Sequence, residues 1–325
     1  MCKRHCLIVF FFVIISCKKE PPKTNSIQLQ GSVFGTTYSI IYYDINIDFD
    51  KEINQLFDQI NKATSTYISS SDISRINKGE KGVKVDSYFR EIFFKSEKIF
   101  EETNGYFDPT VGSLVNAWGF GPEKSLSEID SSKVKELLQF TGFEKVSIED
   151  DIVIKKYPEI YFDFNSIAKG YGLDVVSRFL ESQGVKNYLI EIGGEVKVKG
   201  TKPKGKLWTV QLDNPNSDGT RSAYTYLQLT NKSMASSGNY RKYRIASNGE
   251  KYVHTINPKT GFATESNLLS ATVIAELDCA DVDAYATAFM AMGLEKTKEF
   301  LEKKPELKVI LIYLNDQGQF TEFRN

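Results

Sequence analysis

Apolar residues recur every three or four positions in several segments of the chain, and this spacing is typical of an amphipathic helix. It predicts helices over the following ranges, the last two separated by Gly293: Asp48–Ala63, Ser87–Thr103, Ser166–Gln183, Asp281–Met292 and Leu294–Lys303. Gly105 and Gly184 stand where two of these helices would end, in keeping with the preference for glycine after a helix C-terminus.

Other segments alternate apolar and polar residues, or carry short apolar runs rich in β-branched and aromatic residues, and these patterns predict strands. The expected strands lie in Ile27–Ile45 (a pair), Ile152–Phe164 (one or two), Tyr188–Lys199, Trp208–Leu212, Ala223–Leu229, Leu269–Ile274 and Leu307–Tyr313. Helices and strands are mixed without a strict β–α–β alternation. We therefore expect an α+β fold with mixed sheets and packed helices rather than a doubly wound parallel sheet.

Composition narrows the class of protein. The chain has 325 residues, of which 41% are hydrophobic and 26% charged, so it can bury a substantial core, and wholesale disorder, collagen and coiled coil are excluded. Lys and Arg total 41 against 42 for Asp and Glu, which gives a net charge of −1. Without a basic excess, a nucleic acid is not an expected partner.

The N-terminal residues have the pattern of an export signal. Lys3 and Arg4 supply positive charge, Cys6–Ile15 is an apolar run, and Ser16 and Cys17 follow it. The run is too short to span a bilayer comfortably, although a short membrane anchor is the alternative interpretation. We expect a signal peptide over 1–16, a polar tether over 17–26 and one folded domain over 27–325.

The stretch Val13-Ile14-Ile15-Ser16-Cys17 resembles a bacterial lipobox. That resemblance implies cleavage before Cys17 and lipidation of its thiol and amino groups. Several acyl chains on one residue would anchor the protein stably, where a single chain would not. The expected location is therefore a bacterial membrane, with the protein exported, lipid-anchored and facing the periplasm; inner and outer membrane remain alternatives.

After such cleavage the chain keeps two cysteines, Cys17 and Cys279, and one histidine, His254. A modified and a single unmodified cysteine exclude a disulfide framework. Ordinary zinc sites need several His or Cys ligands, so zinc chemistry is also excluded. Any metal bound here is expected to be a hard cation held by oxygen atoms.

One candidate for such a cation site is the pair Asp283 and Thr287, which lie one turn apart on a predicted helix and so share a face. A carboxylate and a hydroxyl on one face suit Mg²⁺, which takes one or two carboxylates together with phosphates and waters. The alternative is that Asp283 is only a helix-start charge and Thr287 only fills the core.

A second candidate is Asp163–Gly170, where a predicted strand ends and a helix begins, a junction that favours anions. Lys169 in the first turn opposes the helix dipole, so it is interpreted as a phosphate ligand, with a solvated surface lysine as the alternative. Gly193-Gly194 interrupts an apolar strand and indicates either a bulge or close backbone approach. His254 is a candidate proton shuttle, although a lone histidine is more often structural than catalytic.

In order along the chain, these segments resemble the ApbE family of flavin transferases over about residues 30–295. The stretches that carry the resemblance are Phe34–Tyr38 (FGTTY), Ser65–Tyr67 (STY), Asp72–Asn77 (DISRIN), Gly105–Pro109 (GYFDP), Trp118–Gly121 (WGFG), Asp163–Asp174 (DFNSIAKGYGLD), Glu191–Gly194 (EIGG), Ser237–Arg241 (SGNYR), His254–Gly261 (HTINPKTG) and Ala280–Gly293. Each stretch is moderately specific, and their order behind a lipobox is what makes the resemblance strong.

The resemblance implies a tunnelling-fold-like α+β architecture, FAD as substrate and Mg²⁺ as cofactor. It also implies transfer of FMN to a threonine or serine hydroxyl of a target flavoprotein, with release of AMP. Carried over position by position, it assigns the base role to His254, the metal to Asp283, Thr287 and the carbonyl of Ser166, and FAD contacts to Phe34, Tyr67, Tyr106, Phe107, Asp108, Asp163, Lys169 and Ile256.

Three places depart from the family pattern: Phe34 replaces the usual methionine, Asn257 replaces the common aspartate after the histidine, and Asn165-Ser166 replaces a commoner glycine-rich pair. The first change keeps an apolar side chain. The second would weaken activity if the aspartate tunes the histidine or the metal. Two alternatives share the same site: an FAD pyrophosphatase with water as acceptor, and a non-catalytic lipoprotein that binds FAD.

Overall fold

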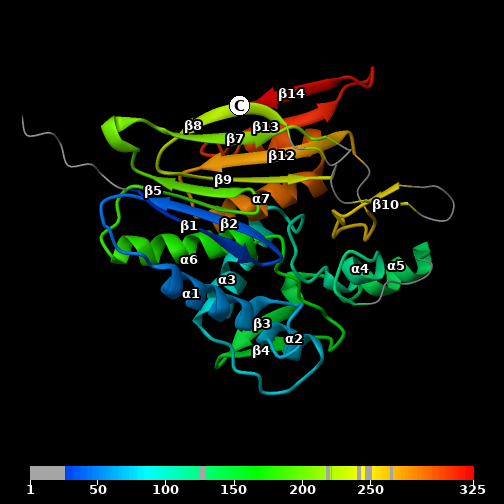
Figure 1. Ribbon diagram of the computed structural model, residues 1–325. Coiled ribbons are helices and arrows are strands. Elements are labelled where there is room, and N and C mark those ends of the chain that lie inside the picture. Colours follow the sequence, from blue (N-terminus) through cyan, green and yellow to red (C-terminus); the bar gives the residue numbers. More distant parts are fainter. Residues whose placement is uncertain are drawn as a thin grey trace, which may run out of the picture.

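The computed structural model describes residues 26–123, 129–216, 220, 222–239, 243–245, 251–263 and 266–325. Its central layer is an eight-stranded sheet in the order β1-β2-β5-β6-β9-β12-β13-β14, in which every neighbouring pair is antiparallel (Figure 1). Its strands are β1 (Ile27–Val33), β2 (Thr36–Tyr42), β5 (Tyr188–Ile192), β6 (Glu195–Lys199), β9 (Lys232–Gly238), β12 (Leu268–Ala275), β13 (Lys308–Leu314) and β14 (Phe320–Arg324).

Helices cover one face of this sheet in two tiers (Figure 1). The first tier is α6 (Ala168–Ser182) and α7 (Cys279–Met292), which contact the central strands β5, β6, β9 and β12. The second tier is α1 (Asp50–Thr64) and α3 (Ser87–Glu102), which pack on α6 and α7. Since α7 lies between sheet and helices, almost all of its residues are buried.

A separate hairpin covers the opposite face of the sheet. Its strands are β7 (Trp208–Asp213) and β8 (Ala223–Leu229). Trp208 and Val210 of this hairpin pack against Val196 of β6 and Met234 of β9 in a second hydrophobic cluster. The result is a layered α+β molecule in which helices cover one face of strands β6 and β9 and the β7–β8 hairpin covers the other.

The remaining elements are short and lie outside the large sheet. They are α2 (Asp72–Asn77), α4 (Gly112–Ala117), α5 (Ser131–Leu138), the hairpin of β3 (Val146–Glu149) and β4 (Ile152–Lys155), the pair β10 (Tyr243–Ile245) and β11 (Lys251–Val253), α8 (Leu294–Leu301), and two single 3₁₀ turns at Phe143–Lys145 and Pro203–Gly205. Most of the predicted helices and strands are confirmed to within a few residues. The central strand β9, the edge strand β14 and most of these short elements were not predicted.

The strand predicted through Ile152–Phe164 is wrong beyond Lys155. At Phe162, the side chain of Asn77 makes the two backbone hydrogen bonds that a neighbouring strand would make. The Asn77 amide donates to the Phe162 carbonyl at 2.9 Å, and the Asn77 side-chain oxygen accepts from the Phe162 amide at 2.8 Å. The backbone is therefore satisfied without a sheet.

The glycine pair in Tyr188–Lys199 is a hairpin turn and not a bulge. Gly193 and Gly194 form the two-residue loop between β5 and β6, with φ angles of 63° and 108°. Tight two-residue hairpins need positive φ, which glycine adopts without strain. The turn reverses the chain so that Glu195 opens β6.

Two sequence-based expectations concern residues 1–25: the export signal with its lipid-bearing Cys17, and most of the tether. These residues lie outside the described part of the chain. Within that part, no helix combines the length and apolar character needed to cross a membrane.

Candidate functional site

The site is built where the N-terminal turn of α6 crosses α7. Gly170 makes this crossing possible, because a Cβ there would lie 2.4 Å from the carbonyl oxygen of Cys279. The amide of Gly170 donates to Oδ2 of Asp283 at 3.1 Å. The backbone of α6 therefore fixes the carboxylate of Asp283, which is 2% exposed.

Lys169, Glu195 and Asp283 form an ion-paired group that we call the site cluster, in which the two carboxylates are buried and the lysine is half-buried. The ammonium of Lys169 lies 3.2 Å from Oε1 of Glu195 and 3.7 Å from Oδ2 of Asp283. Burial by itself would lower the pKa of Lys169, but the two carboxylates outweigh it and raise that pKa above its ordinary value. Burial raises the pKa of both Glu195 and Asp283. Lys169 is thus an ion-paired residue and not the solvated surface lysine of the alternative interpretation.

A second group, the scaffold cluster, lies next along the same three elements and consists of Asp174, Lys197 and Asp278. The carboxylate of Asp174 accepts from the ammonium of Lys197 at 2.6 Å and from the first two amides of α7 at 2.8 and 2.9 Å. Lys197 also bonds Asp278 at 3.2 Å. Asp174 of α6 thus caps the N-terminus of α7, and Gly170 of α6 bonds Asp283 itself. These two contacts fix Asp283 relative to α6.

Thr287 lies one turn after Asp283 on α7, as predicted, and its hydroxyl is 3.1 Å from that of Ser237 on β9. Two residues beyond Ser237, the side chain of Asn239 accepts a hydrogen bond from Thr255 at 2.7 Å. Thr255 is the neighbour of His254 in the sequence. Strand β9 therefore links the predicted metal ligands to the segment of the predicted base.

His254 follows β11 and is half-buried. Its ring lies against that of Phe120, with centroids 6.3 Å apart. The loop after it is fixed on the same segment, because the indole of Trp118 donates to the carbonyl of Gly261 at 2.9 Å. Lys259 of this loop lies over the ring of Tyr106 at 6.0 Å, which brings a predicted FAD residue beside the histidine loop.

Two further predicted FAD residues lie on adjoining segments. The amide of Asp163 donates to the carbonyl of Pro109 at 2.8 Å, which places Asp163 beside the loop that carries Asp108. Asp108 is buried and accepts from the amide and hydroxyl of Thr110 at 2.8 and 2.6 Å. Burial raises its pKa from 3.8 to about 7, against the lowering effect of those hydrogen bonds.

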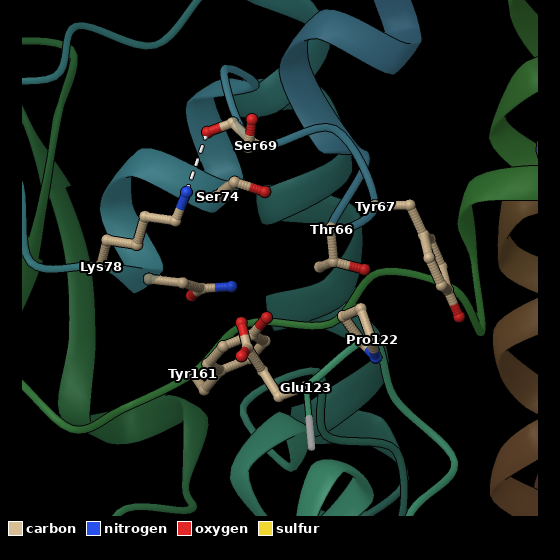
Figure 2. Close-up of a pocket in the computed structure, with 9 residues that line it drawn as sticks. Thr66, Tyr67, Ser69, Ser74, Lys78, Pro122, Glu123 and Tyr161 are labelled. Carbon is tan, nitrogen blue, oxygen red and sulfur yellow. Dashed lines mark hydrogen bonds between the residues drawn. The ribbon is translucent and has the colours of Figure 1, made fainter.

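Tyr67 lines a cavity of about 430 Å³ between the end of α1, helix α2 and the segment after α4 (Figure 2). The ring is 66% exposed, and burial of its hydroxyl together with the nearby Asp163 raises its pKa. Apart from Pro122, the other labelled lining residues are polar or aromatic, among them Ser74, Glu123 and Tyr161. The Thr66 hydroxyl in this wall is buried and has no hydrogen-bond partner among the described residues.

Phe34 occupies the β1–β2 turn at φ 50° and lines a second cavity, of about 490 Å³. Its ring packs edge-on against Phe57 and approaches Gly172 of α6, where a Cβ would lie 2.6 Å from it. Gly172 is three residues from Lys169. The turn therefore lies at the same end of α6 as the site cluster.

Two predicted FAD residues have side chains that belong to the core. Phe107 is 1% exposed in the main hydrophobic core, and Ile256 is 5% exposed in a smaller cluster with Leu114 and Trp118. A ligand contact from Phe107 would therefore use its backbone. Ser166 precedes α6 by two residues and is half-buried.

The donor set at the α6–α7 crossing fits a hard cation in its chemistry. Asp283 and Thr287 offer oxygen atoms on one face of α7, and one ammonium faces the two buried acids Glu195 and Asp283. Within the described residues, no group of three or more His, Cys, Asp or Glu side chains could hold a metal by itself. A cation here would depend on backbone and ligand oxygens as well.

The sequence model of the ApbE family matches residues 34–311, which is most of the chain. The chain belongs to the ApbE family. It is 34% identical over 323 residues to a Haemophilus influenzae protein named FAD:protein FMN transferase, covering 95% of this chain and 92% of that one. A Vibrio cholerae protein of the same name is 33% identical, with 98% and 96% covered.

Solved ApbE structures share the fold. The flavin transferase ApbE from Vibrio cholerae superposes with a TM-score of 0.82 at 32% identity, covering 93% of this chain and 97% of that one. The apo form of Pseudomonas stutzeri flavinyl transferase ApbE has a TM-score of 0.81 at 28% identity, covering 93% and 95%. The resemblance inferred from the motifs and the α+β fold class are both confirmed.

Sequence reasoning missed two residues of this ApbE site. Glu195 comes directly after the Glu191–Gly194 motif, which stops one residue short of it. Its signal was the alternation of β6, which places Glu195 and Lys197 on one face of the strand. Thr66 lay inside a quoted motif, but nothing in the sequence distinguished a buried unpaired hydroxyl from an ordinary one.

Proposed function

We propose that the protein transfers the FMN half of FAD to a threonine or serine hydroxyl of a target flavoprotein and releases AMP, with Mg²⁺ required. The relatives named FAD:protein FMN transferase support the flavin transfer. The observation that carries the proposal is the ion pair between half-buried Lys169 in the first turn of α6 and buried Asp283 on α7. An ammonium and a carboxylate held together there suit a pyrophosphate and a hard cation.

In the proposed site, Asp283 and Thr287 would hold Mg²⁺ through side-chain oxygens, and Ser166 through its backbone carbonyl. When bound, the ion would neutralise charge on the pyrophosphate oxygens. Lys169 would place its ammonium against the same oxygens and stabilise the charge that develops on the leaving phosphate.

His254 would take the proton of the acceptor hydroxyl. The hydroxyl oxygen then forms a bond to the FMN phosphorus, the bond from that phosphorus to the bridging oxygen breaks, and AMP leaves with that oxygen. A neutral hydroxyl needs a base that works near neutral pH, and His254 is the sole histidine after residue 5.

FAD would extend from the site cluster towards the aromatic residues around it. The β1–β2 turn with Phe34 adjoins the head of α6, whereas Tyr67 lines the polar cavity and lies near Asp163. Tyr106 lies beside the histidine loop. In the proposal, the reacting phosphate lies between Lys169 and His254.

The test uses the full-length chain with FAD, Mg²⁺ and a candidate flavoprotein acceptor, followed by intact-mass measurement of the acceptor. A gain of one FMN that disappears with His254→Ala supports the transfer and the base. Lys308→Ala, an exposed change on β13, is the matched control and should retain the gain. AMP release without a mass gain would contradict transfer in favour of FAD hydrolysis, and bound, unchanged FAD would favour a carrier.

We also propose that the protein is exported and anchored through lipid on Cys17, facing the periplasm. The support is the Val13–Cys17 stretch in the sequence. Cell fractionation tests it: the wild-type protein should sediment with membranes, and Cys17→Ala should move it out of the membrane fraction. Equal distribution of both forms would contradict the anchor.

A further inference from the structure

The site cluster places one ammonium between two carboxylates that differ in how well they are satisfied. Asp283 already accepts a hydrogen bond from the amide of Gly170, which fixes it on α6. Glu195 is 3% exposed, and its Oε2 has no hydrogen-bond partner among the residues that the structure describes. Buried acceptors are ordinarily paired, so a free Oε2 indicates that a donor reaches it in another state of the site.

Lys169 is a donor that can move to that oxygen. Its ammonium is already 3.2 Å from Oε1 of the same carboxylate, and a lysine has a flexible stem with three donors. The stem lies against the β5–β6 turn, where a Cβ at Gly193 would be 3.4 Å from Cδ of Lys169. A small displacement away from Asp283 would let both oxygens of Glu195 accept from the ammonium.

We propose that Lys169 is the internal counter-ion of Asp283, and that Glu195 is a positioning residue that receives the ammonium when a divalent cation binds Asp283. This inference rests on the proposed use of Mg²⁺. A divalent ion bound to Asp283 repels an ammonium that is 3.7 Å from the same carboxylate. Glu195 makes the exchange of cations possible by giving Lys169 a second, fully paired position.

The exchange predicts a specific pattern of metal affinities. Glu195→Gln removes the second position, so Lys169 stays on Asp283 and competes with the metal. Lys169→Met removes the competitor and should tighten metal binding. In the Lys169→Met background, Glu195→Gln should then reduce the metal affinity only slightly, because no ammonium remains for Glu195 to reposition.

The experiment is a double-mutant cycle on the full-length protein without FAD, with Mn²⁺ as the probe for Mg²⁺ and electron paramagnetic resonance of free Mn²⁺ as the readout. We expect Glu195→Gln to weaken Mn²⁺ binding about tenfold in the wild-type background and less than about threefold beside Lys169→Met. Equal factors in the two backgrounds, or no weakening in either, would overturn the inference.

Two controls separate failure of the inference from failure of the proposed function. Asp283→Ala should abolish Mn²⁺ binding. If wild type does not bind Mn²⁺, or Asp283→Ala binds it equally, the proposed metal site itself is wrong. Should Glu195→Gln fail to fold by circular dichroism, Glu195→Asp replaces it. This variant keeps the charge and withdraws the oxygens from Lys169, so weaker Mn²⁺ binding supports positioning and unchanged binding contradicts it.

Discussion

The scaffold cluster and the site cluster lie side by side on α6, β6 and α7, yet they differ in how completely their hydrogen bonds are made. In the scaffold cluster, Asp174 accepts three hydrogen bonds of 2.6 to 2.9 Å, from Lys197 and from the first two amides of α7. In the site cluster, Lys169 pairs at 3.2 and 3.7 Å, and Oε2 of Glu195 has no partner.

The charge balance differs as well. Asp278, the second carboxylate of the scaffold cluster, also bonds Lys95 at 2.8 Å, so each acid there has a short contact to an ammonium. Burial raises the pKa of Asp278, but the two lysines outweigh it and lower that pKa to about 2. In the site cluster, two carboxylates share one ammonium. The first arrangement holds the helices together, whereas the second leaves charge and an acceptor for a ligand.

The largest effect is expected when the scaffold cluster is broken. Asp174→Ala leaves the ammonium of Lys197 without its short partner and removes the cap of α7. We expect a loss of about 5 kcal/mol in the free energy of unfolding, the upper end for a broken buried pair. Urea denaturation measures it. A loss below about 1 kcal/mol, the range of an exposed pair, would show that the two clusters do not differ as described.

Asp108 is a buried carboxyl whose short hydrogen bonds come from neutral groups, the amide and hydroxyl of Thr110, and not from an ammonium. It therefore tests what a missing positive charge does to a buried acid, in contrast to Asp174 and Asp278. The folded pKa of about 7 lies above the ordinary 3.8, a difference of about 4 kcal/mol. Below pH 4, where Asp108 is protonated in both the folded and the unfolded chain, its burial costs no free energy of unfolding. The free energy of unfolding then falls as the pH rises from 4 to about 7, because only the unfolded chain ionises Asp108 easily. Asp108→Asn should thus match wild type near pH 4 and exceed its unfolding free energy at pH 8 by up to about 4 kcal/mol.

The outcome for Asp108→Asn is read from urea denaturation at the two pH values. Groups that titrate equally in both proteins cancel in the difference between them. A constant difference across this pH range would show that burial does not set the pKa of Asp108.

The smallest effect on stability is expected within the site cluster. Asp283→Asn removes one of two acids that share Lys169 and leaves the shorter pair with Glu195 in place. Without added divalent metal, we expect the free energy of unfolding to stay within about 1 kcal/mol of wild type or to rise. A loss of about 3 kcal/mol or more, as for a broken buried pair, would place Asp283 with the scaffold instead.

The sequence predicted much of the fold where the pattern is local. The helical periods of α1, α3, α6 and α7 were visible, because each buries one stripe or is apolar throughout. Strand β9 (Lys232–Gly238) was missed because most of its residues are small serine, alanine and glycine, which do not resemble a strand. They are small because α7 packs directly on them, a fact that no local window contains.

The same division applies to the site. The sequence by itself determined that Asp283 and Thr287 share a face, because a helix fixes residues four apart, and that Gly193-Gly194 needs an unusual backbone. Only the tertiary structure decided that Lys169 faces two acids and that an oxygen of Glu195 lacks a partner. Those contacts join α6, β6 and α7 across long stretches of chain, and the packing of sheet against helix, not the period of any element, sets their distances.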